Sequence, residues 1–421
     1  MTDEKQNHTT DQPGGIPTPE RPEVPVRTVI STVDDFHDAV EAIALGEGPV
    51  AVDAERASGF RYSQRAYLIQ LYRRGAGSFL FDPPAIGEFA PLQSVIGDEE
   101  WVLHAASQDL PCLREVGLDP VRVFDTELGA RLLGIPRVGL GSVVEDLLGI
   151  HLAKEHSAAD WSTRPLPASW LEYAALDVEL LIDLRDSMAV LLEQQGKLEI
   201  AAQEFAAVVA KEEKAPLAEP WRRLTGVSAL RPDKHLAAAR ELWLARDELA
   251  RATDTAPGRL VPDASLMVAA RALPTSRREL AGLKQFSGRA SRSEIDRWWA
   301  AIERALATDD IPVHRRATDT LPPPRSWADR NPEADVRLKN ARAALTAVSE
   351  ERSIPLENLL TPDFLRRLAW KGVEPLALET VQEELAALGA RPWQIELNAQ
   401  PILQAFVEAR QTGETPPIAE S

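Results

Sequence analysis

The residues that most clearly suggest chemistry are two carboxylates near the start of the chain, Asp53 and Glu55. They follow a short apolar run, Val50–Val52, and Gly48 and Pro49 precede that run, which predicts a short buried strand. Residues i and i+2 of a strand point to the same face, so the two carboxylates would lie side by side. A divalent cation such as Mg²⁺ or Mn²⁺ would compensate their repulsion best, because it prefers carboxylate oxygens. The alternative is a pair of solvated charges at a strand end.

A second apolar run, 101–103, also ends in polar residues, from His104 to Asp109. Asp109 falls in the first turn of a predicted helix, where it is either a third carboxylate of the site or a charge favoured by the helix dipole. His104 is either a groove residue or a structural hydrogen bonder. Asp125 and Thr126 follow the next predicted strand and have the pattern of an ordinary helix N-terminus, to which we assign no chemistry.

A long helix is predicted from Pro167 to about Leu191, and it carries Tyr173 and Asp177. These two residues are i and i+4, hence neighbours on one helix face. A tyrosine hydroxyl one turn from a carboxylate would hold a water beside a metal bound by that carboxylate. The alternative is a buried tyrosine whose hydroxyl is satisfied on the helix surface.

The surrounding elements predict an α/β domain with a mixed sheet. A helix opens at the capping box Thr32–Asp35, after a short strand over 28–31. Two strands joined by a turn follow the carboxylate strand, and helices and strands alternate beyond them. The strands are expected over 67–72, 78–81, 101–103 and 121–124, and the helices over 89–96, 108–116 and 139–148.

Composition excludes several classes of protein. The chain has 421 residues and a net charge of −18, but residues 216–306 hold 16 Lys and Arg against 11 Asp and Glu, so this segment is locally basic and suits a phosphate partner. Cys112 is the single cysteine, which excludes a disulfide framework or thiolate metal site and predicts a cytoplasmic protein. No apolar run approaches the ~20 residues of a membrane span. Neither a P-loop nor a nucleophile elbow is present.

Three stretches resemble, in order, the three motifs of the DEDD-type 3′→5′ exonucleases. They are Val52–Glu55 with Leu68-Ile-Gln70, then Leu103–Asp109, then Tyr173–Asp177 in the tyrosine-bearing form. The run from Lys154 through Asp160-Trp161 to Arg164-Pro-Leu166 further resembles the ribonuclease D family. Two departures concern the substrate groove: Ala54 replaces a frequent threonine, and Arg56–Gly59 replaces an aromatic-containing continuation.

The resemblance implies a ribonuclease H-like 3′→5′ exonuclease fold that binds two divalent cations, Mg²⁺ or Mn²⁺. The implied metal ligands are Asp53, Glu55, Asp109 and Asp177, and Tyr173 would orient or help deprotonate the attacking water. Candidate substrate contacts are Gln70, His104, Lys154 and Arg164. Lys154 and Arg164 are alternatively solvated or ion-paired charges.

The region beyond residue 214 is expected to be helical. Arg259–Asp263, Leu266 and Leu273-Pro274 resemble the HRDC domain shared by helicases and ribonuclease D, and Ile354–Leu360 echoes the same pattern. The predicted division is a disordered lead over 1–26, an exonuclease domain over 27–213, an HRDC domain over 214–307, a Pro-rich linker over 308–328, a second HRDC-like domain over 329–410 and a flexible tail over 411–421.

These features predict a metal-dependent 3′→5′ exoribonuclease that releases 5′-mononucleotides from RNA with a free 3′ end, tRNA precursors above all. The helical units would bind RNA backbone, or serve only as a packing or dimerisation scaffold. Neither a membrane nor an obligate protein partner is implied. The alternatives are an exonuclease acting on DNA 3′ ends and an RNA-binding adaptor with an inactive nuclease domain.

Overall fold

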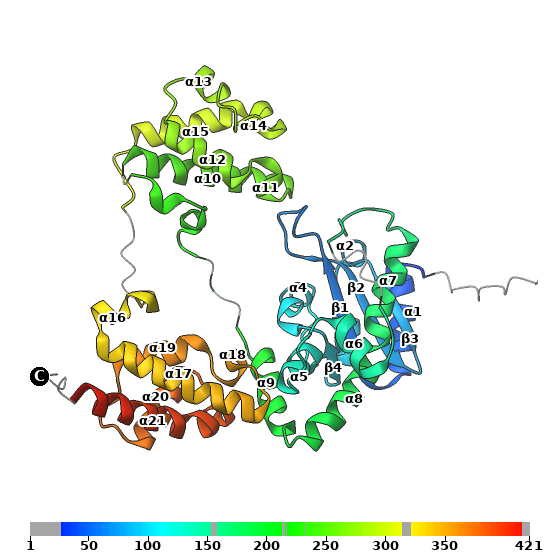
Figure 1. The fold of residues 1–421 in the computed structure, drawn as a ribbon. Coiled ribbons are helices and arrows are strands. Elements are labelled where there is room, and N and C mark those ends of the chain that lie inside the picture. The colour runs from blue at the N-terminus through cyan, green and yellow to red at the C-terminus, as the bar shows by residue number, and fades with distance from the viewer. Residues whose placement is uncertain are drawn as a thin grey trace, which may run out of the picture.

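The computed structural model describes residues 27–152, 158–212, 215, 217–231, 233–313 and 321–414. These residues form an α/β domain, a first helical unit up to residue 313 and a second helical unit from residue 321 (Figure 1). The predicted N-terminal lead, Lys154, part of the predicted Pro-rich linker and the end of the predicted tail lie outside the described residues. None of the described helices combines the length and the apolar character needed to cross a membrane.

A five-stranded mixed sheet organises the α/β domain, as the sequence predicts. Its strand order is β3-β2-β1-β4-β5. β1 pairs antiparallel with β2, and β2 with β3, whereas β1–β4 and β4–β5 are parallel. The parallel arrangement brings the carboxyl ends of β1 and β4 to the same edge of the sheet. The strands are β1 Glu47–Arg56, β2 Ala66–Arg74, β3 Gly77–Phe81, β4 Glu100–Leu103 and β5 Arg122–Asp125.

Helices cover both faces of this sheet (Figure 1). The first begins at the predicted cap, where the Thr32 hydroxyl accepts a hydrogen bond from the Asp35 amide, and it buries Phe36, Val40 and Ile43. The helical elements of the domain are α1 Val33–Ala44, α2 Pro83–Ile86, α3 Ala90–Ile96, the 3₁₀ turn η1 Ala106–Gln108, α4 Leu110–Arg114, α5 Thr126–Leu132, α6 Leu140–Leu148, α7 Ala168–Glu179, α8 Leu181–Gln194 and α9 Leu198–Val209.

Three predicted elements differ in the structure. The long helix predicted over 167–191 is two helices, because the helix is interrupted at Leu180. The first, α7, packs on β2 and β3, whereas α8 lies against β1 and β4. The strand over 28–31 is reduced to one bridge between Ile30 and Phe81, since α1 begins directly after it. The helix that precedes the predicted tail continues to Glu414.

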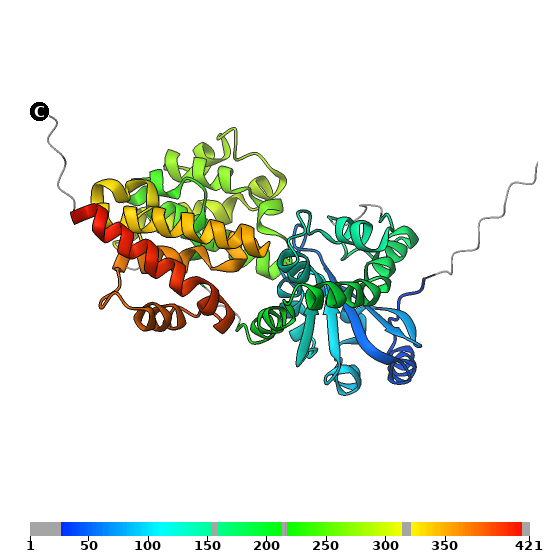
Figure 2. The ribbon, with the colours of Figure 1, turned by 60° about the horizontal axis from the view of Figure 1, so that its bottom comes forward.

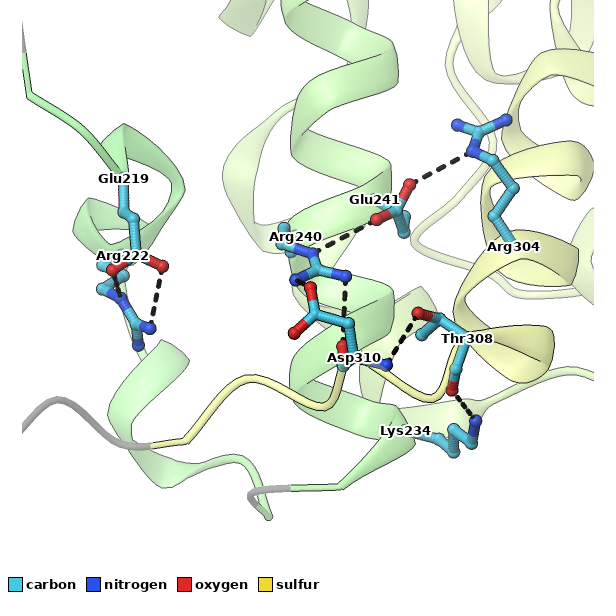
Figure 3. A network of polar contacts seen from close by, with 8 residues as sticks. All are labelled: Glu219, Arg222, Lys234, Arg240, Glu241, Arg304, Thr308 and Asp310. Carbon is cyan, nitrogen blue, oxygen red and sulfur yellow. Dashed lines mark hydrogen bonds and ion pairs between the residues drawn. The ribbon is translucent and has the colours of Figure 1, made fainter.

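The first helical unit has a hydrophobic core of its own, built on Leu242, Trp298 and Ile302 among others. Figure 3 shows how its two chain ends are held together: Arg240 Nη1 lies 2.7 Å from Asp310 Oδ2, and Lys234 Nζ donates to the Thr308 carbonyl. The unit comprises η2 Pro220–Arg223, η3 Val227–Ala229, α10 Lys234–Thr253, α11 Pro257–Leu260, α12 Asp263–Ala272, α13 Arg277–Ala281, α14 Arg289–Ser293 and α15 Ile295–Ala307.

The second helical unit instead shares one continuous core with the α/β domain. Glu204 of α9 is buried and accepts from Arg391 and, at 2.8 Å, from the indole of Trp393. Lys197 donates to the Leu132 carbonyl at 2.6 Å and to that of Ser353 at 3.4 Å. Figure 2 shows α9 beside the second unit. The unit comprises η4 Pro324–Ser326, α16 Trp327–Arg330, α17 Pro332–Arg352, α18 Leu356–Leu359, α19 Pro362–Lys371, α20 Leu378–Ala387 and α21 Pro392–Glu414.

Candidate active site

A hollow of about 720 Å³ opens where β1 and β4 end and α7 crosses the sheet. All five residues to which the sequence assigns the chemistry line it: Asp53, Glu55, Asp109, Tyr173 and Asp177. We call it the catalytic hollow. Residues separated by more than a hundred positions thus meet at one place.

Three of the carboxylates are close enough to share a cation. Asp53 and Glu55 come from the end of β1 and Asp177 from α7, and one carboxylate oxygen of each lies within 4.8 Å of the others. The i, i+2 spacing on a strand accounts for the first two. The third depends on α7 packing across β1.

Asp109 belongs to the same group electrostatically. It occupies the N-cap position of α4, yet its side chain makes no cap hydrogen bond and is 6% exposed. Its charge raises the pKa of Glu55, and Asp53 raises its own pKa in turn. Asp109 therefore lies in the same hollow as the other three carboxylates, as expected of a fourth carboxylate of the site.

Burial raises the pKa values of all four carboxyl groups, and repulsion between them adds to the pKa shifts of three. Desolvation is the largest cause in every case, and it raises the pKa of Asp177 to about 7. Repulsion from Asp53 adds to the pKa shifts of Glu55, Asp109 and Asp177. The protein therefore only partly compensates the charge that these four groups carry when they are ionised. Such an oxygen-rich, acidic set fits divalent cations such as Mg²⁺ or Mn²⁺.

Tyr173 and Asp177 lie one turn apart on α7 and are linked by a side-chain hydrogen bond. Burial, followed by the charges of Asp177 and Glu55, raises the pKa of the Tyr173 hydroxyl. A phenol with a raised pKa stays protonated at neutral pH. The hydroxyl at the wall of the catalytic hollow is therefore protonated in the metal-free protein.

Arg56 is a functional candidate that reasoning from the sequence missed. Strand alternation would turn it away from Glu55, yet Arg56 lines the catalytic hollow, at a register shift between Glu55 and Arg56 in the β1–β2 pairing. Its charge lowers the pKa values of Asp53, Glu55 and Asp109. The only signal in the sequence was its place among the residues that depart from the family pattern.

Asp125 organises the turn that carries the second motif. Its carboxylate accepts from the amides of Glu127 and Leu128 at the start of α5, as expected of a helix N-terminus. It also accepts from the amides of Ala105, at 3.0 Å, and Ala106, at 2.9 Å. Ala105 has a φ of 64°, a left-handed conformation that these bonds hold in place. Asp125 thereby positions the chain between His104 and Asp109.

His104 lines the catalytic hollow and is held by Thr126, whose hydroxyl lies 2.8 Å from its Nδ1. Burial lowers the pKa of the imidazole to about 4, so the ring is neutral at pH 7. The position is compatible with a groove residue, and the fixed ring is equally a structural hydrogen bonder.

Two of the predicted substrate contacts do not line the catalytic hollow. Gln70 lies opposite Asp53 in the β1–β2 pairing and is fully buried, so it offers RNA no surface. Arg164 spends its five N–H donors on Asp82 and on the carbonyls of Tyr67, Trp161 and Thr163. It clamps the segment before α7 to the sheet, which corresponds to the ion-paired alternative. Lys154 lies outside the described residues.

Comparison with known proteins gives this arrangement its family. Residues 28–193 match the family model described as 3′-5′ exonuclease. The ribonuclease D of Escherichia coli is 30% identical over 351 residues, which cover 82% of this chain and 90% of that protein. The ribonuclease D of Cronobacter turicensis is 31% identical over 301 residues, covering 68% and 81%. The chain belongs to the ribonuclease D family. The protein is therefore a hydrolytic 3′→5′ exoribonuclease.

Two solved structures are similar to this protein over most of its length. A protein from Bifidobacterium adolescentis is 38% identical with a TM-score of 0.83, and the match covers 91% of this chain and 97% of that one. The E. coli ribonuclease D is 28% identical with a TM-score of 0.66, covering 90% and 98%. It is described as an exoribonuclease involved in structured RNA processing.

The helical units match two different models. Residues 235–302 match the HRDC domain, which confirms that module in the first helical unit. Residues 320–406 match the model described as the 3′ to 5′ exonuclease C-terminal domain. The interpretation of the second unit as a second HRDC copy stays a prediction.

Proposed function

We propose that this enzyme removes nucleotides one at a time from the 3′ end of RNA, with two divalent cations bound by Asp53, Glu55, Asp109 and Asp177. The observation that carries the proposal is the meeting of these four carboxylates and Tyr173 at one hollow. A protein without need of a cation has no physical reason to bury carboxylates that raise one another's pKa.

The bound cations would supply an activated water and stabilisation of the leaving 3′ oxygen. The chain's own residues then have three tasks. The carboxylates fix the positions of the cations. The protonated hydroxyl of Tyr173, hydrogen-bonded to Asp177, orients the attacking water. Arg56 places a positive charge in the catalytic hollow, where it would contact the phosphate that gains negative charge in the transition state.

The substrate is RNA with a free 3′ end, and the released products are 5′-mononucleotides. Support for structured RNA, tRNA precursors above all, comes from the family and from the description of the E. coli relative. Recognition would rest on the shape of the RNA and on its single-stranded 3′ end, with no reading of base edges. A neutral His104 at the wall of the hollow is compatible with contact to the terminal nucleotide.

A time course on a 3′-extended tRNA and on a DNA strand of matched sequence tests the substrate assignment. With Mg²⁺ or Mn²⁺ we expect shortening of the RNA from its 3′ end, release of mononucleotides, and much slower shortening of the DNA. Equal shortening of the DNA would extend the substrate to 3′ ends in general. Binding of the tRNA without any shortening would contradict the proposal and favour the adaptor alternative.

A further inference from the structure

The HRDC domain contacts the catalytic domain through the loop that joins β1 to β2, residues 57–65. We call this segment the β1–β2 loop. Figure 1 shows it reaching from the sheet to α11. The loop also borders the chemistry, because Ser58, Gly59 and Phe60 line the catalytic hollow. One short segment is thus shared by the HRDC domain and the site of hydrolysis.

Polar contacts fix the loop at the end of α10. Asp254, in the left-handed conformation that ends this helix, accepts from the Ser63 amide at 2.9 Å and from the Tyr67 hydroxyl at 3.1 Å. The Tyr62 hydroxyl donates to Asp247 at 3.0 Å. These bonds hold the loop in one position against the HRDC domain.

Arg259 of α11 carries the contact to the rim of the catalytic hollow. Its Nε donates to the Gly59 carbonyl at 2.8 Å, and its guanidinium carbon lies 3.8 Å from the centre of the Phe60 ring. The Ala256 amide also donates to the Phe60 carbonyl at 3.0 Å. Arg259 is exposed, and no carboxylate of the described residues forms an ion pair with it. Its two terminal nitrogens are therefore available to a ligand.

We propose that Phe60 and Arg259 together form an RNA subsite at the rim of the catalytic hollow, built from two domains. In this subsite Arg259 contacts a backbone phosphate of the single-stranded 3′ segment, and the Phe60 ring packs on a nucleobase. The inference rests on the exonuclease function proposed above. A guanidinium presents paired N–H donors to a phosphate, and an aromatic ring stacks on any base. The subsite therefore suits an enzyme that accepts every sequence.

The arrangement also gives the HRDC domain a specific task. The α/β domain supplies the ring and the HRDC domain supplies the cation, so the subsite is complete only while the two are in contact. Because the subsite lies beside the carboxylates and outside their group, it contributes to binding in the ground state. Loss of such an interaction raises KM and leaves kcat nearly unchanged.

The test uses the full-length enzyme and a 5′-fluorescein-labelled single-stranded RNA. For Arg259→Ala and for Phe60→Leu we expect a KM about tenfold higher with kcat within about twofold of wild type. Fluorescence anisotropy in EDTA reports binding alone. There the slope of log Kd against log salt concentration should fall by about 0.7 for Arg259→Ala, the value for one lost phosphate contact on a single strand. Arg259→Lys keeps the charge and should retain the wild-type slope.

Arg278→Ala is the matched control, because Arg278 is an exposed arginine of α13, at the end of the same domain away from the loop (Figure 1). Its KM and salt slope should equal those of the wild type. An unchanged KM for Arg259→Ala overturns the proposal, and so does a raised KM with an unchanged salt slope, which would mean that Arg259 only docks the HRDC domain. If the wild type fails to shorten RNA, the proposed function fails, and the anisotropy data still decide whether the subsite exists.

Discussion

Asp177 shows at the scale of one residue how burial prepares the catalytic hollow for cations. Desolvation and the neighbouring Asp53 raise its pKa to about 7, from an ordinary value near 3.8. Between about pH 4 and pH 7, the folded, metal-free protein therefore keeps a proton on Asp177 that the unfolded chain has lost. A cation and a proton compete for the same oxygens, so pH and metal concentration should act on the same group.

The first prediction concerns stability against pH. Between about pH 4 and pH 7 the folded state binds a proton on Asp177 that the unfolded state does not bind, so this contribution to stability is present at low pH and is lost as the pH rises through about 7. We expect a lower Tm at pH 8 than at pH 6 in EDTA, and a larger rise in Tm on adding Mg²⁺ at pH 8. Asp177→Asn should reduce both differences. If the Tm in EDTA were higher at pH 8 than at pH 6, and Asp177→Asn removed that difference, the inference that burial raises the pKa of Asp177 would be wrong.

The second prediction concerns the hydroxyl of Tyr173. Tyr173→Phe keeps the ring on α7 and removes only the donor that faces Asp177. We expect kcat on an RNA oligonucleotide to fall by about 10²-fold, the lower range for a group that orients a proton transfer, with KM and Tm nearly unchanged. Single-turnover kinetics would measure this. A wild-type kcat in the variant would remove Tyr173 from the chemistry.

At the scale of elements, the turn between β4 and α4 depends on Asp125. Four backbone amides donate to this one carboxylate, two from the turn and two from the start of α5. Asp125→Ala leaves them without their acceptor. We expect a loss of about 3 kcal/mol in the free energy of unfolding and a lower kcat/KM, because the turn that places Asp109 relaxes.

Thr32→Ala is the control for this third prediction. Thr32 caps α1, away from the catalytic hollow, and its loss should cost about 1 kcal/mol while kcat/KM stays at the wild-type value. Denaturant titrations and initial rates on the same preparations compare the two variants. Equal kcat/KM for both variants and wild type would show that Asp125 is a helix cap alone.

Sequence patterns predicted the mixed sheet and the strand that delivers Asp53 and Glu55, because a two-residue period and flanking turn residues act locally. They did not predict that Arg56 lines the catalytic hollow, at a register shift in the pairing of β1 with β2. The division of 167–191 into α7 and α8 was also not predicted, since no glycine or proline marks the boundary and the packing of the two helices on different strands decides it. The ion pair of Arg164 could not be predicted for a similar reason, because its partner Asp82 lies far from it in the sequence.

At the scale of the whole molecule, the HRDC domain lies between two segments that share one core. The second helical unit completes the buried surface of the α/β domain, whereas the HRDC domain closes on itself and ties its own ends through Arg240 and Asp310. Charge counts indicated that residues 216–306 are locally basic, but they carry no information on which of the three units pack together. A chain cut near residue 212 would leave Glu204 without Arg391 and Trp393.

The fourth prediction follows from this division. We expect an enzyme with residues 217–313 replaced by a flexible Gly/Ser linker to remain folded and to shorten short RNA oligonucleotides. Its affinity for a 3′-extended tRNA should fall at least tenfold, and its dependence on salt should weaken, because phosphate contacts are lost. Binding measured at several salt concentrations would check this. Unchanged tRNA affinity would reduce the HRDC domain to a scaffold.

If the buried carboxylates form a cation-dependent hydrolytic centre, the rate of hydrolysis must depend both on the ion and on Asp53. The rate of mononucleotide release is followed as the shortening of a 5′-labelled RNA, against free Mg²⁺ or Mn²⁺, for the wild type and for Asp53→Asn. We predict no release in EDTA. At low ion concentrations the rate should rise more steeply than in proportion to the concentration, and in Asp53→Asn the rate should be about 10³-fold lower. Release at the wild-type rate in EDTA, or by Asp53→Asn, would contradict the account.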